Sequence, residues 1–135
     1  MDLRSHCPIN FTLEHFGDKW SFLIIRDLMF KGKRHYNEFL EAGEKVSTSV
    51  LGDRLKKLEE TGIISKGQDN VKKSRIRYSL TQKGIDLLPI LLEMIVWGSN
   101  NDKLTESPEE FMDEAINHRD KLLESYRESL IRDHL

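Results

Sequence analysis

Positively charged side chains are concentrated in one stretch of the sequence, residues 47–77. This stretch contains eight basic and four acidic residues, whereas residues 99–135 contain five basic and ten acidic ones. The net charge of the whole chain is -2, so the excess of basic over acidic residues is a property of this segment and not of the chain. Lysine and arginine gathered on one surface of an otherwise acidic chain are suited to binding phosphate groups. If the asymmetry stood alone, an ordinary solvated surface would be the simpler explanation.

Cys7 is the single cysteine, which excludes an internal disulfide but permits a reactive thiol or a bridge between subunits. Such a thiol reacts readily only when its pKa is lowered, and Arg4 or His6 could supply the positive charge. Inert packing of the thiol is the alternative. His6, Cys7 and His15 lack the spacing of metal ligands, so we expect no metal and no other cofactor. No phosphate-binding glycine loop or nucleophile signature occurs, which argues against an enzyme.

An amphipathic helix is predicted over residues 46–62. Ser47 is a good N-cap, and Leu51, Leu55 and Leu58 recur at the spacing that forms one apolar face. The apolar face can pack while the opposite face stays free to contact a ligand. The residues expected to contact it from this helix are Ser47, Thr48, Ser49, Gly52, Arg54, Lys56 and Lys57.

Residues 63–66 and 75–80 are predicted to be two short strands joined by an exposed turn. A short helix at residues 36–40 and a turn at residues 43–45 precede the amphipathic helix, which is the arrangement of a helix-turn-helix. A helix-turn-helix followed at once by a basic hairpin indicates a winged helix, a mainly α fold with a small β-hairpin. The basic residues expected to contact phosphates from the hairpin are Lys72, Lys73, Arg75 and Arg77.

The remaining helices are predicted to join two copies of the chain. Helices are expected near residues 11–16 and 18–31, and residues 81–98 form an expected helix, bent at Pro89, that is apolar nearly all round. One side of that helix can be buried within the subunit, and the other needs a partner. A last helix is expected from Pro108 onward. The predicted homodimer interface consists of Phe11, Leu13, Leu88, Leu91, Leu92, Ile95, Trp97, Phe111, Leu122 and Tyr126.

The sequence resembles the HxlR-type winged-helix transcriptional regulators, which are related in architecture to the MarR repressors. The resemblance covers residues 7–98 and rests on five motifs in order: CPI, GDKWSFLIIRDL, HYNEF, VS..VL..RL..LE..GI and YSLTQKG. It implies a homodimer that binds an inverted-repeat operator in double-stranded DNA and often represses until an effector or oxidant arrives. It also implies a sensing role for Cys7, and phosphate contacts by Arg34 and His35 at the start of the third expected helix.

These patterns predict a winged helix-turn-helix domain with dimerisation helices at residues 1–100, followed by a helical extension at residues 101–135 that joins the dimer interface. The longest apolar run is far shorter than the ~20 residues of a membrane span, and the N-terminus lacks an apolar signal core. We therefore expect a cytoplasmic DNA-binding regulator that does not bind membranes, its effector and operator unidentified. The alternative is a winged-helix module that binds another protein and not DNA.

Overall fold

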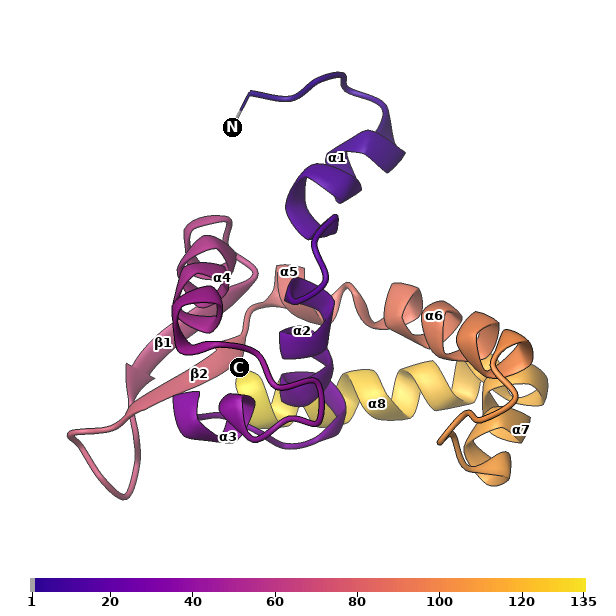
Figure 1. Ribbon diagram of the computed structural model, residues 1–135. Helices are drawn as coiled ribbons and strands as arrows, with labels where there is room; N and C mark the ends of the chain where they lie inside the picture. The colour runs from indigo at the N-terminus through magenta and orange to yellow at the C-terminus, as the bar shows by residue number, and fades with distance from the viewer. Residues whose placement is uncertain (1) are drawn as a thin grey trace.

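The computed structural model describes residues 2–135, which form eight helices and one antiparallel hairpin (Figure 1). The first four helices precede the hairpin of β1 (Ile64–Gln68) and β2 (Ile76–Leu80), and the other four follow it. No helix among these residues combines the length and apolar character needed to cross a membrane. The helices are α1 (Pro8–Phe16), α2 (Ser21–Phe30), α3 (Tyr36–Leu40), α4 (Thr48–Glu60), α5 (Gln82–Ile85), α6 (Leu88–Asn101), α7 (Glu109–Asn117) and α8 (Arg119–His134).

Helices α2, α3 and α4 with the hairpin form a winged helix-turn-helix, as predicted. The three leucines of α4 are buried in one core with Ile25 of α2 and Phe39 of α3. Each buried leucine contributes roughly 1.5–3 kcal/mol through removal of apolar surface from water. This packing fixes which face of α4 is turned away from the protein.

The connection from the hairpin into α5 depends on a glycine. Thr81 caps α5 by accepting a hydrogen bond from the backbone N–H of Gly84, and its hydroxyl donates to the Gly62 carbonyl at 2.6 Å. A Cβ atom at Gly84 would overlap the carbonyl oxygen of Ile63. A side chain there would push α5 off the start of the hairpin, because backbone atoms cannot rotate aside.

The helix predicted over residues 81–98 is two helices, which corrects the expectation of one helix bent at Pro89. Pro89 lies in the first turn of α6, where a missing N–H costs no hydrogen bond. The expected terminal helix is likewise divided into α7 and α8, with the break at His118. The first helix begins at Pro8, earlier than predicted.

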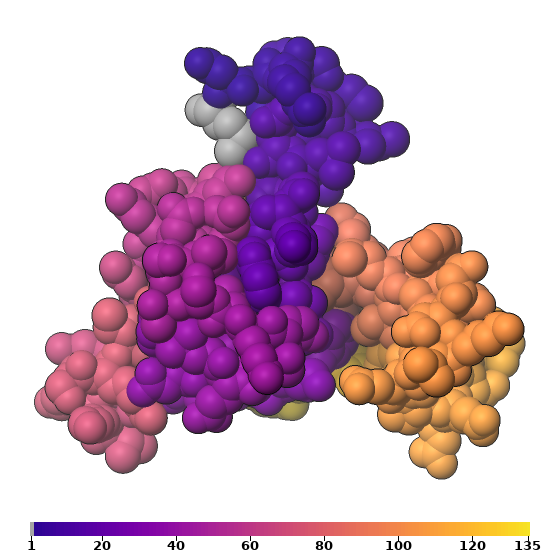
Figure 2. Space-filling view, in the orientation of Figure 1, coloured from indigo at the N-terminus to yellow at the C-terminus, as the bar shows by residue number. Residues whose placement is uncertain are grey.

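Helices α6, α7 and α8 form a second group with its own small core around Leu92, Ala115 and Leu122. Figure 2 shows α1 and the α6–α7 pair as two projections from the body of the molecule. From this group α8 runs back behind the body in the view of Figure 1, so that its C-terminal end lies beside α2 and β2. The long terminal helix therefore connects the second group to the base of the wing.

Candidate nucleic-acid interface

The first turns of α4 present small polar groups to solvent. Ser47 accepts a hydrogen bond from the backbone N–H of Val50, and Tyr36 donates its hydroxyl to the Thr48 carbonyl at 2.9 Å. These two contacts hold the start of α4 in place while Thr48 and Ser49 stay exposed. Gly52 has open space where a Cβ would lie, so this turn of the helix can approach a ligand closely.

Lys56 is exposed on the same helix, whereas Arg54 and Lys57 are held against the N-terminal segment. Arg54 Nε lies 3.1 Å from Asp18 Oδ1 but does not form an aligned hydrogen bond with it, and Lys57 Nζ donates to the Glu14 carbonyl. Burial raises the pKa of Asp18, but hydrogen bonds to its carboxylate and the charge of Arg54 outweigh this and keep the pKa below its ordinary value. Arg54 and Lys57 therefore help to position α4, and contact between them and DNA stays a prediction.

The tip of the wing is pinned by Asp69, which is 6% exposed. Its Oδ2 accepts hydrogen bonds from the backbone N–H groups of Lys72 at 2.9 Å and Val71 at 3.1 Å, and Arg75 Nη2 lies 3.3 Å away. The Lys72 N–H is the largest of several donors that lower the pKa of this carboxylate, so it stays ionised. The turn is thereby held in one shape with Lys72 and Lys73 exposed.

His35 connects α3 to the wing. Its Nδ1 lies 2.5 Å from Glu38 Oε1, and its Nε2 lies 2.7 Å from Asp69 Oδ1. Both partners are carboxylates, so both hydrogen bonds form together only when each ring nitrogen carries a proton. The sequence predicted that His35 contacts a phosphate, but both of its ring nitrogens are hydrogen-bonded within the protein.

Arg34 lies at the base of the wing and is turned toward α8. Its Nε donates to the Tyr78 carbonyl at 2.7 Å, its Nη2 donates to Ser79 Oγ at 2.6 Å, and its Nη1 donates to the Asp133 carbonyl at 3.3 Å. Arg77 is half-buried, and together with Arg34 and the end of α8 it lines a pocket. The structure thus leaves the α4 face and the wing-tip residues Lys72 and Lys73 exposed, and it directs Arg34 toward α8.

His134, which sequence reasoning missed, completes this junction. Its Nδ1 accepts a hydrogen bond from the backbone N–H of Leu80 at 3.0 Å, so this nitrogen must be unprotonated. Burial, assisted by the charge of Arg34, lowers the pKa of His134 to about 4. Nothing in the local sequence signals this contact, because its partner lies 54 residues away.

Folding stability should fall between pH 6.5 and pH 4 because of His134. The unfolded chain binds a proton at His134 below about pH 6.5, whereas the folded protein does not until about pH 4, so acid favours unfolding. The expected loss is about 1–2 kcal/mol, less than the full linkage value because the ring is only partly buried. Urea unfolding at a series of pH values measures it. His134→Asn keeps an acceptor for the Leu80 N–H and should remove this fall in stability between pH 6.5 and pH 4. His118→Asn, at the exposed start of α8, should leave the fall unchanged.

The predicted dimer interface divides into exposed and buried residues. Phe11 and Leu13 on α1 and Trp97 on α6 are exposed, with Trp97 at 71%. Ile95, Phe111 and Tyr126 are partly buried. Leu88, Leu91, Leu92 and Leu122 are buried within their own subunit, which corrects their assignment to the interface. The exposed apolar residues of α1 and α6 also include three that the sequence did not predict for the interface, namely Ile9, Ile90 and Met94.

Cys7 is exposed at the N-cap of α1, and the pKa of its thiol is lowered. The backbone N–H groups of Asn10 and Ile9, at the open end of the helix, favour the thiolate and are the cause. Arg4, the expected source of positive charge, binds Glu14 and Asn10 with its guanidinium instead.

The HxlR-like helix-turn-helix family model matches residues 15–106 of the chain. YybR of Bacillus subtilis, an uncharacterized HTH-type transcriptional regulator, is 35% identical over 104 residues, which cover 77% of this chain and 82% of that protein. The oxidized redox regulator HypR is 33% identical with a TM-score of 0.64, covering 73% of this chain and 100% of the HypR chain. Quinone-bound YodB of B. subtilis is 29% identical with a TM-score of 0.56, covering 70% and 98% of the two chains. The chain therefore belongs to the HxlR-like helix-turn-helix family, whose members are DNA-binding transcriptional regulators and not enzymes.

Proposed function

We propose that the protein is a homodimeric repressor that binds an inverted-repeat operator. The observation that carries this proposal is the pairing of an exposed polar α4 start with a pinned basic wing tip in one winged helix. In such an arrangement the helix enters the major groove and the wing contacts the backbone or minor groove beside it. Thr48, Ser49 and Lys56 are assigned to the groove, and Lys72 and Lys73 to phosphates.

Two copies are needed to contact two half-sites, whose centres lie about 34 Å apart on one face of the duplex. The exposed apolar residues of α1 and α6 support dimerisation, because a monomer seldom leaves so much apolar surface on two neighbouring projections. A symmetric pair joined through these helices would hold both α4 helices on the same side.

The proposed function is tested by selecting bound fragments from the genome and measuring affinity for the recovered inverted repeat by fluorescence anisotropy. With 6–10 phosphate contacts, the affinity should fall about 10³- to 10⁵-fold between 50 and 200 mM salt. A scrambled duplex of equal length should bind more weakly at every salt concentration. Equal affinity for both duplexes, or an affinity that does not change with salt concentration, would favour a protein-interaction module.

The effector is proposed to act through Cys7. HypR is a redox regulator and YodB has been obtained with a bound quinone, so oxidants and electrophiles are the relevant class of effector. In this chain the thiol is exposed, its pKa is lowered, and it begins the helix assigned to the dimer interface. A modified Cys7 would change how α1 packs in the dimer and so weaken operator binding.

Treatment of the protein with diamide or benzoquinone should weaken operator binding about tenfold or more, because an altered dimer places one half-site out of register. Cys7→Ser should bind the operator as the untreated protein does and should not respond to either reagent. Anisotropy measured before and after treatment gives both values. If the treated wild-type protein binds the operator with unchanged affinity, Cys7 is not the sensor.

A further inference from the structure

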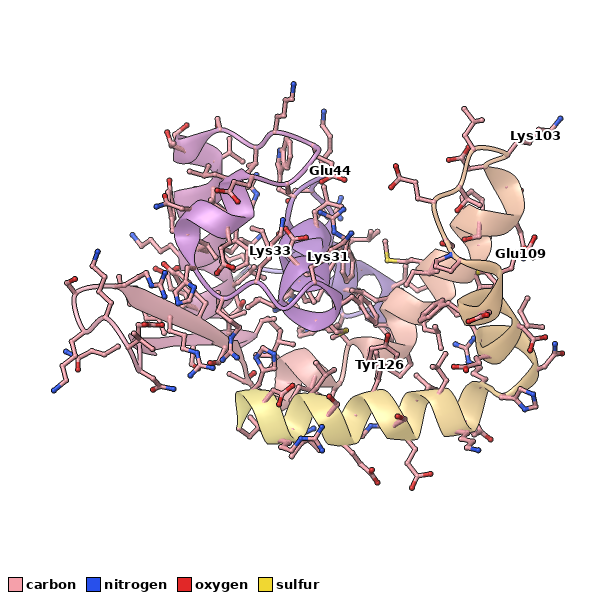
Figure 3. All side chains as sticks on the ribbon, turned by 90° about the horizontal axis from the view of Figure 1, so that it is seen from below. Lys31, Lys33, Glu44, Lys103, Glu109 and Tyr126 are labelled. Carbon is pink, nitrogen blue, oxygen red and sulfur yellow. The ribbon has the colours of Figure 1, made fainter. Side chains whose placement is uncertain are left out.

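A pocket of about 530 Å³ lies where the end of α2, the β2 strand and the C-terminal half of α8 meet. Its polar lining includes three arginines, Arg34, Arg77 and Arg132, and its apolar lining includes the buried side chains of Leu28 and Leu130. Figure 3 views the molecule from below, with α8 along one edge and Tyr126 on the side of α8 that faces the body. The pocket is therefore built by the terminal helix and the wing together.

The positive charge of this pocket is not balanced. Asp133 is the one carboxylate in the lining, and its Oδ1 lies 3.9 Å from Arg132 Nε. Arg77 forms no side-chain hydrogen bond or ion pair with any of residues 2–135. Burial, together with the charge of Arg77, lowers the pKa of Arg34, and the charges of both arginines contribute to the lowered pKa of His134. The charge of Asp133 acts on both groups in the opposite direction, as does that of Glu38 on Arg34, yet the pKa of each stays lowered.

We propose that this pocket binds a small organic acid, with the carboxylate against Arg77 and Arg132 and the hydrocarbon part on Leu28 and Leu130. An arginine binds a carboxylate through two parallel hydrogen bonds, and Arg77 has its donors free for them. The apolar lining distinguishes this site from a simple phosphate contact, since a DNA backbone gains nothing from buried leucines. Helix α8 lies outside residues 15–106, so the pocket forms between the shared family domain and the extension of this chain.

The same pocket would link an organic acid to DNA binding, a step that rests on the proposed function. Arg77 is part of β2, and Arg34 holds β2 to α8 through Tyr78, Ser79 and the Asp133 carbonyl. A carboxylate bound between the wing and α8 would change the strength of these hydrogen bonds between β2 and α8. The angle of the wing relative to α4 would then change with occupancy of the pocket.

The first test uses benzoate as the probe and needs no DNA. Titration followed by ¹H–¹⁵N NMR should shift the amides of Gly32, Arg77 and residues 129–134, while benzyl alcohol, the neutral analogue, should shift them far less. Arg132 has a side chain that is 74% exposed, so Arg132→Gln should fold normally and bind benzoate about tenfold more weakly. Arg127→Gln on the same helix, outside the pocket lining, is the matched control and should bind as wild type.

Unshifted amides at millimolar benzoate, or equal binding by the Arg132→Gln and wild-type proteins, would overturn the proposal. Saturation by inorganic phosphate or by an operator duplex with the same amide shifts and the same affinity would also overturn it, because the apolar lining would then be irrelevant. A second titration measures operator affinity with and without benzoate in the wild-type and Arg132→Gln proteins. Because the first titration contains no DNA, binding of the acid stands or falls separately from the proposed function.

Discussion

Replacement of both Lys72 and Lys73 with alanine is expected to weaken operator binding about 100-fold at moderate salt. Both side chains are exposed at the wing tip, and neither forms an ion pair with any of residues 2–135. A dimer would lose four cations near phosphates, so the slope of log affinity against log salt should become shallower by about 3 to 4. The loss should be similar for the operator and for a scrambled duplex, since phosphate contacts carry no sequence information.

Lys103 and Lys121 provide the matched control, because both are exposed and lie far along the chain from the wing. The double alanine variant at these positions changes the net charge equally and should keep the affinity and salt slope of the wild type. An equal loss in both double variants would show a general charge effect and would contradict the assignment of the wing. Full affinity in the Lys72 and Lys73 variant would do the same.

The parts of the fold that sequence patterns predicted are those with a strong local period. Leu51, Leu55 and Leu58 mark one face of α4, and alternation along residues 75–80 marks β2. In contrast, α6 is apolar nearly all round, so its sequence does not indicate which leucines face inward. The structure buries Leu88, Leu91 and Leu92 and exposes Ile90, Met94 and Trp97 because α8 and the body cover only one side.

The electrostatic contacts of the candidate site were not predictable for a different reason. His35 binds Asp69 across 34 residues, and Leu80 binds His134 across 54 residues. Charge counting treats each basic residue as available, yet Arg34 and Arg54 are engaged within the subunit. Composition thus located the positive segment, and only tertiary structure shows that Lys56, Lys72 and Lys73 stay exposed, with Lys56 Nζ 3.9 Å from Glu60 Oε1 at the surface.

Aspartate at both Met94 and Trp97 is expected to convert the dimer to a monomer and to weaken binding to the full operator about 1000-fold. These residues lie with Ile90 on one face of α6, at the spacing of successive helical turns, and a charge there would lose its water on association. A monomer contacts one half-site at a time and loses the effective concentration that the second half-site provides. Sedimentation velocity measures the mass, and anisotropy measures affinity for duplexes with one or two half-sites.

The two duplexes separate a lost dimer from a damaged winged helix. The variant should bind a single half-site as well as a wild-type subunit does, because α4 and the wing tip lie apart from α6 (Figure 1). Leu104→Asp combined with Ile116→Asp is the control, since both are exposed apolar residues outside α6 and should leave mass and affinity unchanged. A Met94 and Trp97 variant that stays dimeric would place the subunit contact elsewhere. If the wild-type protein is itself a monomer with full operator affinity, two-fold recognition of an inverted repeat is wrong.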